Sequence, residues 1–217
     1  MVRGAARYAV LALGLVVPLT ACEDIVGPGK GSLSVRMSRE DAATAAALIA
    51  ADLVDASVGP VALEAVQSID VTITAIQVQP EGADDDGGPW VTLDLTAPAS
   101  VNLLALPTES GTGLLVATDE VEAGAYGHLR LLFSDATITF NQDVTLGANT
   151  YTAGTAYPLT IPSGAQTGIK LELGGIEVPE GGAAEVELVF DAALSVDNVL
   201  ATGAGILMTP VMHVVKD

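Results

Sequence analysis

The stretch VEAGAYGHLRLLF, residues 121–133, decides the fold class. In its second half, Leu129 and Leu131 recur at every other position, which is the period of a β-strand with one apolar face. Its first half places Gly124 and Tyr126 just before that strand. We expect the Tyr126 hydroxyl to bond backward to the main chain across a corner, so Gly124 and Tyr126 are predicted to be structural residues.

Short alternating segments recur along the chain. GSLSVRM at 31–37 and WVTLDL at 90–95 each predict a strand, and turn signals such as DDDGG and PEGG separate such segments. The residues expected to face inward in these two strands are Leu33, Val35, Met37, Val91, Leu93 and Leu95. In SIDVTITAIQV, residues 68–78, the apolar phase slips, which predicts a β-bulge near Thr74 and Ala75.

One stretch breaks the alternation. REDAATAAALIAADLVDA, residues 39–56, is rich in alanine and predicts a helix that could pack Leu48, Ile49 and Leu53 on a sheet. Many short strands with this one helix predict an all-β protein. We expect an antiparallel immunoglobulin-like β-sandwich over residues 31–217, forming a single domain, with the Ala-rich helix inserted after the first strand.

The amino-terminal residues have the layout of a secretory signal. Arg3 and Arg7 precede an apolar run that is too short to span a bilayer, and small residues follow it. The run ends in LTAC at 19–22, and Cys22 is the only cysteine of the chain. LTAC resembles the lipobox of bacterial lipoproteins, and this resemblance implies a lipidated Cys22. We therefore expect a signal peptide at 1–21 and a lipidated amino terminus with a short tether over residues 22–30. An ordinary secreted protein with a stray thiol is the alternative.

The charge of the chain restricts its partners. The 217 residues include 27 acidic and 8 basic residues, and removal of the leader with its two arginines would change the net charge from −19 to −21. Such a surface repels nucleic acid and anionic headgroups. We therefore expect no nucleic-acid partner, and we expect membrane attachment through the lipid.

A family resemblance covers nearly the whole chain after the leader. The order of GSLSVRMS, VQSIDVTITAIQV, VEAGAYGHLRLLF, YPLTIPSGAQTGIKLEL and VPEGGAAEVELVFDAALSV resembles bacterial lipoproteins built on a domain of unknown function, the DUF4382 family. The most recognisable phrases are the Gly-x-Tyr at Gly124 and Tyr126, the Pro-Ser-Gly at 162–164 and the Phe-Asp-Ala at 190–192. The resemblance implies a lipid-anchored β domain without an assigned activity.

Residues that could carry chemistry are few. His128 and His213 are the only histidines, and we expect them at surface or edge positions, because two isolated histidines make neither a convincing metal site nor a triad. Trp90 is the one possible sugar contact, and packing at the sandwich rim is the favoured alternative. No cofactor is expected beyond the covalent lipid and a possible calcium ion at Asp84, Asp85 and Asp86.

These observations favour a non-catalytic binding or structural module. We expect it to be anchored in the bacterial cell envelope, to face the periplasm or the exterior, and to meet an unknown protein or glycan partner. The alternative is an envelope hydrolase with an unrecognised pair of carboxylates, because 27 acids always allow some pair.

The lipid on Cys22 predicts where the protein is found in the cell. Cys22→Ala should move the protein out of the membrane fraction, since lipid chains supply the attachment. Fractionation followed by immunoblotting measures this, and mass spectrometry of the mature amino terminus should show a modified cysteine. An unmodified thiol, or a mature terminus elsewhere, would contradict the prediction.

The acidic loop EGADDDGGPW, residues 81–90, predicts weak calcium binding. Calcium accepts carboxylate, carbonyl and water oxygens, and a site present only in the folded state raises the melting temperature. Millimolar calcium should therefore stabilise the protein slightly, and Asp84→Asn combined with Asp86→Asn should remove the effect. An unchanged thermal melting curve of the wild type would identify the loop as a solvated turn.

Overall fold

The computed structural model describes residues 29–40, 61–83, 88–96, 100–108, 111–162, 167–202 and 205–216. Its elements are β1 (Lys30–Arg39), η1 (Leu63–Ala65), β2 (Val66–Pro80), β3 (Val91–Leu93), β4 (Ser100–Asn102), η2 (Leu103–Ala105), β5 (Leu114–Glu122), β6 (Gly124–Phe140), β7 (Val144–Leu146), β8 (Asn149–Tyr151), β9 (Ala156–Thr160), β10 (Ile169–Val178), β11 (Ala183–Asp191), α2 (Ala192–Asp197), β12 (Leu200–Thr202), β13 (Gly205–Leu207) and β14 (Val211–Lys216).

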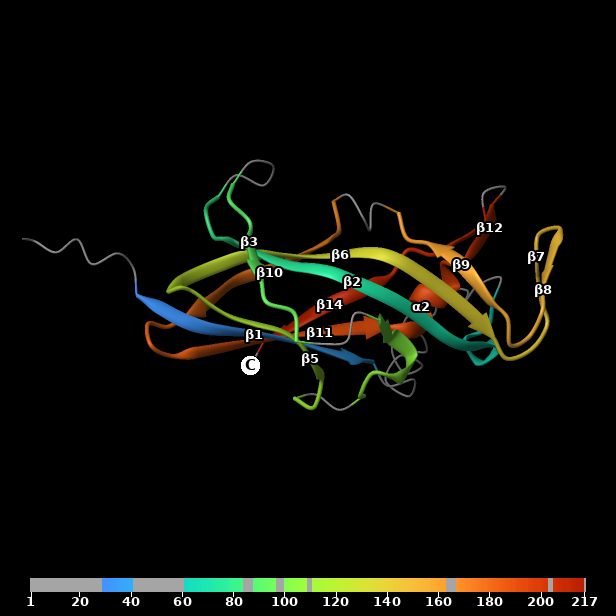
Figure 1. Ribbon diagram of the computed structural model, residues 1–217, viewed down its shortest axis with the longest axis horizontal. Helices are drawn as coiled ribbons and strands as arrows, with labels where there is room; N and C mark the ends of the chain where they lie inside the picture. Colours follow the sequence, from blue (N-terminus) through green and yellow to red (C-terminus); the bar gives the residue numbers. More distant parts are fainter. Residues whose placement is uncertain are drawn as a thin grey trace, which may run out of the picture.

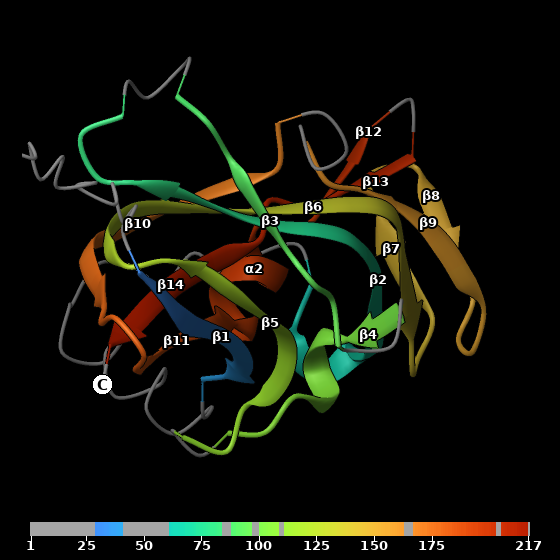
Figure 2. The same ribbon diagram turned by 60° about the vertical axis from the view of Figure 1, so that its left-hand side comes forward.

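Two main sheets form the described part of the protein (Figure 1). The smaller sheet has the order β14-β11-β1-β5, and the larger has the order β12-β13-β9-β6-β2-β3. In addition, β10 pairs with β6, and β4 pairs with β2. The hairpin of β7 and β8 lies at one end of the molecule, beside β9 (Figure 2). The prediction of an all-β sandwich is confirmed.

The core comes from the alternating apolar residues of both sheets. Leu33, Val35 and Met37 of β1 are fully buried, as are Leu129 and Leu131 of β6. Each strand therefore turns one face inward and leaves the other for polar residues, as the two-residue period requires. The residues predicted to face inward in these two strands are confirmed.

The predicted bulge in β2 is also present. The pairing of β2 with β6 shifts register between Ile73 and Ala75, and the buried positions change phase there. An extra residue in one strand bends it and strengthens its twist, which lets long strands curve over a core. This shift decides which residues of β2 and β6 lie side by side further along the strands.

The prediction for Leu95 is wrong. We expected it to face inward with Leu93, but its side chain is 40% exposed. Strand β3 ends at Leu93, and Leu95 instead forms an isolated bridge to Ala117 of β5. The chain thus leaves the larger sheet after Leu93 and runs along the edge strand β5 of the smaller sheet. The alternation of inward and outward side chains therefore ends with β3.

Strand β1 has one parallel neighbour. It pairs with β11 in parallel from Ser32 opposite Ala183 to Arg39 opposite Phe190, and with β5 in antiparallel orientation. A second parallel pair joins β13 to β9. The remaining pairs between the named strands described in the two main sheets are antiparallel.

The corner at residues 122–126 joins the two sheets. Strand β5 belongs to the smaller sheet and β6 to the larger, and Gly124 between them has a φ of 147°, which L side chains rarely adopt. The hydroxyl of Tyr126 donates to the carbonyl oxygen of Glu122 at 2.9 Å, and the Tyr126 side chain is 2% exposed. This is the backward bond to the main chain that the sequence predicts, and Gly124 and Tyr126 form the corner together.

The Phe-Asp-Ala phrase marks the start of α2. Asp191 is the N-cap of this helix, and its carboxylate accepts a hydrogen bond from the Leu194 amide at 2.9 Å. The Ser195 hydroxyl donates to the Asp191 carbonyl and accepts from the Val211 amide at 2.8 Å. Ser195 therefore fastens α2 to the start of β14.

Several predictions fall outside the described residues. The leader at 1–21, Cys22 and most of the tether lie there, as do Asp84, Asp85 and Asp86. The predicted Ala-rich helix lies outside them from residue 41 onward, whereas Arg39 is the last residue of β1.

The buried hydroxyl of Tyr126 predicts a loss of stability on its removal. Tyr126→Phe should lower the free energy of unfolding by about 1 kcal/mol, the usual net value of a neutral hydrogen bond. Burial, and secondarily the Glu122 carboxylate, raise the pKa of Tyr126 above 10.0. Because the hydroxyl then ionises more readily in the unfolded chain, its contribution is present below pH 10.0 and is lost as the pH rises through the folded pKa.

Urea denaturation at neutral pH and at alkaline pH measures both effects. Tyr151→Phe is a matched control, because Tyr151 is also buried and its hydroxyl makes no hydrogen bond among the described residues. It should change the free energy of unfolding little. A Tyr126→Phe variant as stable as the wild type at neutral pH would contradict the role of the corner.

Candidate functional site

A row of polar side chains crosses the outer face of the larger sheet. Ile76 and Val78 face the core, so Gln77 between them faces outward. The register places Gln77 opposite both Thr92 of β3 and Arg130 of β6. Arg130 is in turn opposite Lys170 of β10. We name the set formed by these residues and the neighbouring tryptophan the Trp90 platform: Gln77, Trp90, Thr92, Arg130 and Lys170.

Trp90 packs against cations rather than in the core. Its ring centroid lies 4.2 Å from the Arg130 guanidinium carbon and 5.8 Å from the Lys170 ammonium nitrogen. The negative face of an indole ring attracts such cations. Trp90 is half-buried and is not among the apolar residues that pack on the core. The favoured interpretation of Trp90 as a rim-packing residue is therefore replaced by packing on Arg130.

Neutral groups hold Arg130 in place. Its Nε donates to the side-chain oxygen of Gln77 at 2.5 Å, and the Gln77 amide nitrogen donates to the Thr92 hydroxyl at 2.7 Å. Gln77 thereby uses both its amide oxygen and its amide nitrogen, and these two partners set the orientation of its side chain. These contacts fix the direction of the guanidinium, and neither Gln77 nor Trp90 carries a charge.

Arg130 has no carboxylate partner within the part of the chain that the structure describes. This is unusual in a chain with 27 acidic residues, and Arg36 on the other sheet does pair with Glu185 at 2.9 Å. Only the Nε atom of Arg130 makes a hydrogen bond to a described residue. Its two terminal nitrogens thus remain as donors in the planar fork that matches a carboxylate or a phosphate.

Gly88, two residues before Trp90, lies close to Gln79 of β2. A Cβ on Gly88 would come within 2.6 Å of the Gln79 side-chain nitrogen and 2.5 Å of the Ala83 Cβ. Gln79 is fully buried. The second glycine of GGPW is therefore needed for this close approach.

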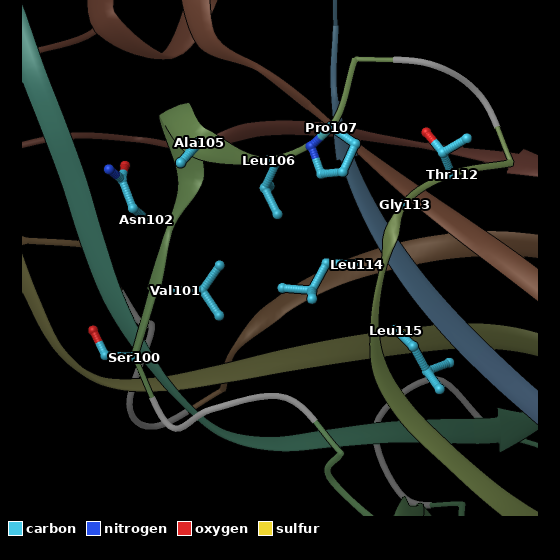
Figure 3. Close-up of a pocket in the computed structure, with 10 residues that line it drawn as sticks. All are labelled: Ser100, Val101, Asn102, Ala105, Leu106, Pro107, Thr112, Gly113, Leu114 and Leu115. Atoms are coloured by element: carbon cyan, nitrogen blue, oxygen red, sulfur yellow. The ribbon is translucent and has the colours of Figure 1, made fainter.

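Two hollows lie away from the platform. One, of about 560 Å³, opens between β4 and β5, and Val101, Leu106 and Leu114 point into it (Figure 3). The Asn102 side chain at its rim accepts the Leu104 amide hydrogen and so caps η2. The lining includes no charged side chain among the described residues, and Asn102 at its polar rim is engaged in local structure.

The second hollow has a mixed lining. It measures about 590 Å³ between β10 and the smaller sheet, and Glu177, Glu185 and Lys216 contribute to its lining. Lys216 donates to the carbonyl oxygen of Gly174 at 2.8 Å, and Glu185 binds Arg36. Two of these three charged groups thus have partners within the protein.

The buried carboxylates of the described residues serve the fold. Glu187 and Asp191 are 5% and 7% exposed, respectively. Glu187 accepts the Gly111 amide hydrogen at 3.0 Å, and Asp191 is the cap of α2. Backbone amides are thus partners of both groups.

The histidines are not brought together. His128 is half-buried on β6 of the larger sheet, whereas His213 is exposed on β14 of the smaller sheet. No group of three or more histidine, cysteine or acidic side chains suited to a metal ion occurs among the residues that are described. Of the helices in those same segments, none is long and apolar enough to cross a membrane.

Comparison with known proteins identifies a family without an assigned role. The family model described as Domain of unknown function (DUF4382) matches residues 46–210, about three quarters of the chain. No curated protein matches the sequence. The match includes every residue of the Trp90 platform and the corner at Tyr126.

Proposed function

We propose that this chain, which belongs to the DUF4382 family of domains of unknown function, is a bacterial envelope lipoprotein that binds an anionic ligand. Cys22 would carry the lipid and hold the protein on a membrane, facing the periplasm or the exterior. The folded domain would act as a non-catalytic binding module, with the Trp90 platform as its binding face.

The position of Arg130 carries the proposal. Its terminal nitrogens have no partner among the described residues, and Gln77 and Trp90 hold it on an exposed sheet face. A donor fork that is already oriented loses little conformational freedom when an anion binds. Lys170 adds a second positive charge 5.8 Å from the same ring. Two of the six basic residues that follow Cys22 therefore meet at one place.

The buried carboxylates support a binding module over the hydrolase alternative. A glycosidase needs one carboxyl group as a proton donor and a second as base or nucleophile. Glu187 and Asp191 accept hydrogen bonds from backbone amides at structural positions. Both carboxylates are therefore engaged in local structure at these positions.

Fluorescence of Trp90 tests whether the platform accepts anions, because Trp90 is the only tryptophan of the chain. We expect iodide to quench it more strongly than caesium, each relative to its effect on free tryptophan, in the full chain in neutral detergent. At about 0.1 M salt, charges farther than about 10 Å away are largely screened, so the potential at the ring is set by nearby charges, which include Arg130 and Lys170.

Arg130→Gln should weaken the quenching by iodide and strengthen that by caesium. Lys30→Gln is the matched control, because Lys30 is exposed on β1 and its loss changes the net charge equally. It should leave the ratio of the two ions unchanged. Stronger quenching by caesium in the wild type would refute the proposed function.

A further inference from the structure

The Trp90 platform combines three features that point to one class of ligand. The Arg130 fork matches a single carboxylate, half-buried Trp90 supplies an indole ring beside it, and Gln77 and Thr92 add amide and hydroxyl groups. Such a surface suits a ligand that carries a carboxylate beside a ring with C–H groups on its faces.

The net charge of the protein narrows the choice further. A charge of −19, or −21 without the leader, repels a polyanion over long distances. A ligand with one negative charge avoids most of that repulsion and still fills the Arg130 fork. An anionic membrane surface and a nucleic acid are disfavoured for the same reason.

The indole ring favours a sugar over an acidic peptide. The negative face of its π-system attracts the weakly positive C–H groups on the face of a pyranose ring. A flexible acidic side chain offers a carboxylate but no comparable rigid face. The ring and the carboxylate of a uronic acid, by contrast, are covalently joined.

We infer that the Trp90 platform binds a short oligosaccharide with one uronic acid residue, whose carboxylate meets Arg130 and whose ring stacks on Trp90. The inference rests on the proposed function, because it names the ligand class of the same face. Lys170 strengthens the attraction through its charge, and Gln77 is a positioning residue that sets the direction of the Arg130 fork.

The test uses three matched disaccharides with the full chain in neutral detergent. Glucuronosyl-glucose carries the carboxylate, its methyl ester lacks only the charge, and cellobiose lacks the carboxyl group. Trp90 fluorescence should respond to the acid with at least about tenfold higher affinity than to either neutral sugar, since charge-assisted hydrogen bonds are the stronger ones.

Variants separate the roles of the side chains. Arg130→Lys keeps the charge but loses the fork, so it should weaken binding of the acid by about tenfold. Lys170→Gln should weaken it by a smaller factor, and Lys30→Gln should leave it unchanged. Thermal melting of each variant shows whether it folds. Gln77→Glu is a second test variant: its new carboxylate should form an ion pair with Arg130 and so weaken binding of the acid.

Salt provides an independent readout. Raising the salt from about 0.01 M to about 0.15 M shortens the screening length from about 30 Å to about 8 Å, so it weakens long-range repulsion more than close contact. The affinity for the acidic disaccharide should therefore fall by less than about twofold, or rise, when salt is added. A protein with a basic binding surface loses affinity steeply under the same change.

The outcomes distinguish this inference from the proposed function. Equal affinity for the acid and its methyl ester, or no effect of Arg130→Lys in a folded variant, would overturn the uronic acid assignment. If iodide still quenches Trp90 preferentially, the anion-binding face stands and only the ligand class is wrong. If both the iodide preference and the response to the acid are absent, both proposals fall.

Discussion

The hydrogen bond from Tyr126 to the Glu122 carbonyl fixes the corner between the two sheets. It closes the corner where the chain passes from β5 in the smaller sheet to β6 in the larger one. Strand β6 is then the central strand to which β2, β9 and β10 pair. The same strand carries Arg130 on its outer face, so the corner and the platform belong to one continuous element.

Much of this fold follows from local patterns in the sequence. The alternation of Leu129 and Leu131 predicts the strand, and the phase slip near Thr74 predicts the bulge, because both depend only on neighbouring residues. The corner is also local, since its donor and acceptor are four positions apart. The prediction for Leu95 was wrong because the chain changes sheets after Leu93, which no periodicity announces.

The platform is harder to predict because it depends on distant pairing. Trp90 and Arg130 lie 40 positions apart, and they meet only through the register of β2, β3 and β6. Two signals were available: a single tryptophan, and an arginine at an outward position of a strand. Neither shows that the two residues touch, because the register shifts in β2 alter the pairing by one residue at a time. The parallel pairing of β1 with β11 is equally invisible to alternation.

The position of β1 has a mechanical consequence. This first described strand lies between β11 and β5 rather than at an edge, and it pairs with β11 over eight successive positions. A pull on the chain ahead of Gly29 acts along β1, so it loads the hydrogen bonds to both neighbours in shear and at the same time. Only a force perpendicular to β1 would break its hydrogen bonds one after another. Tension that enters β1 from its amino-terminal side is therefore opposed by the hydrogen bonds to both neighbouring strands.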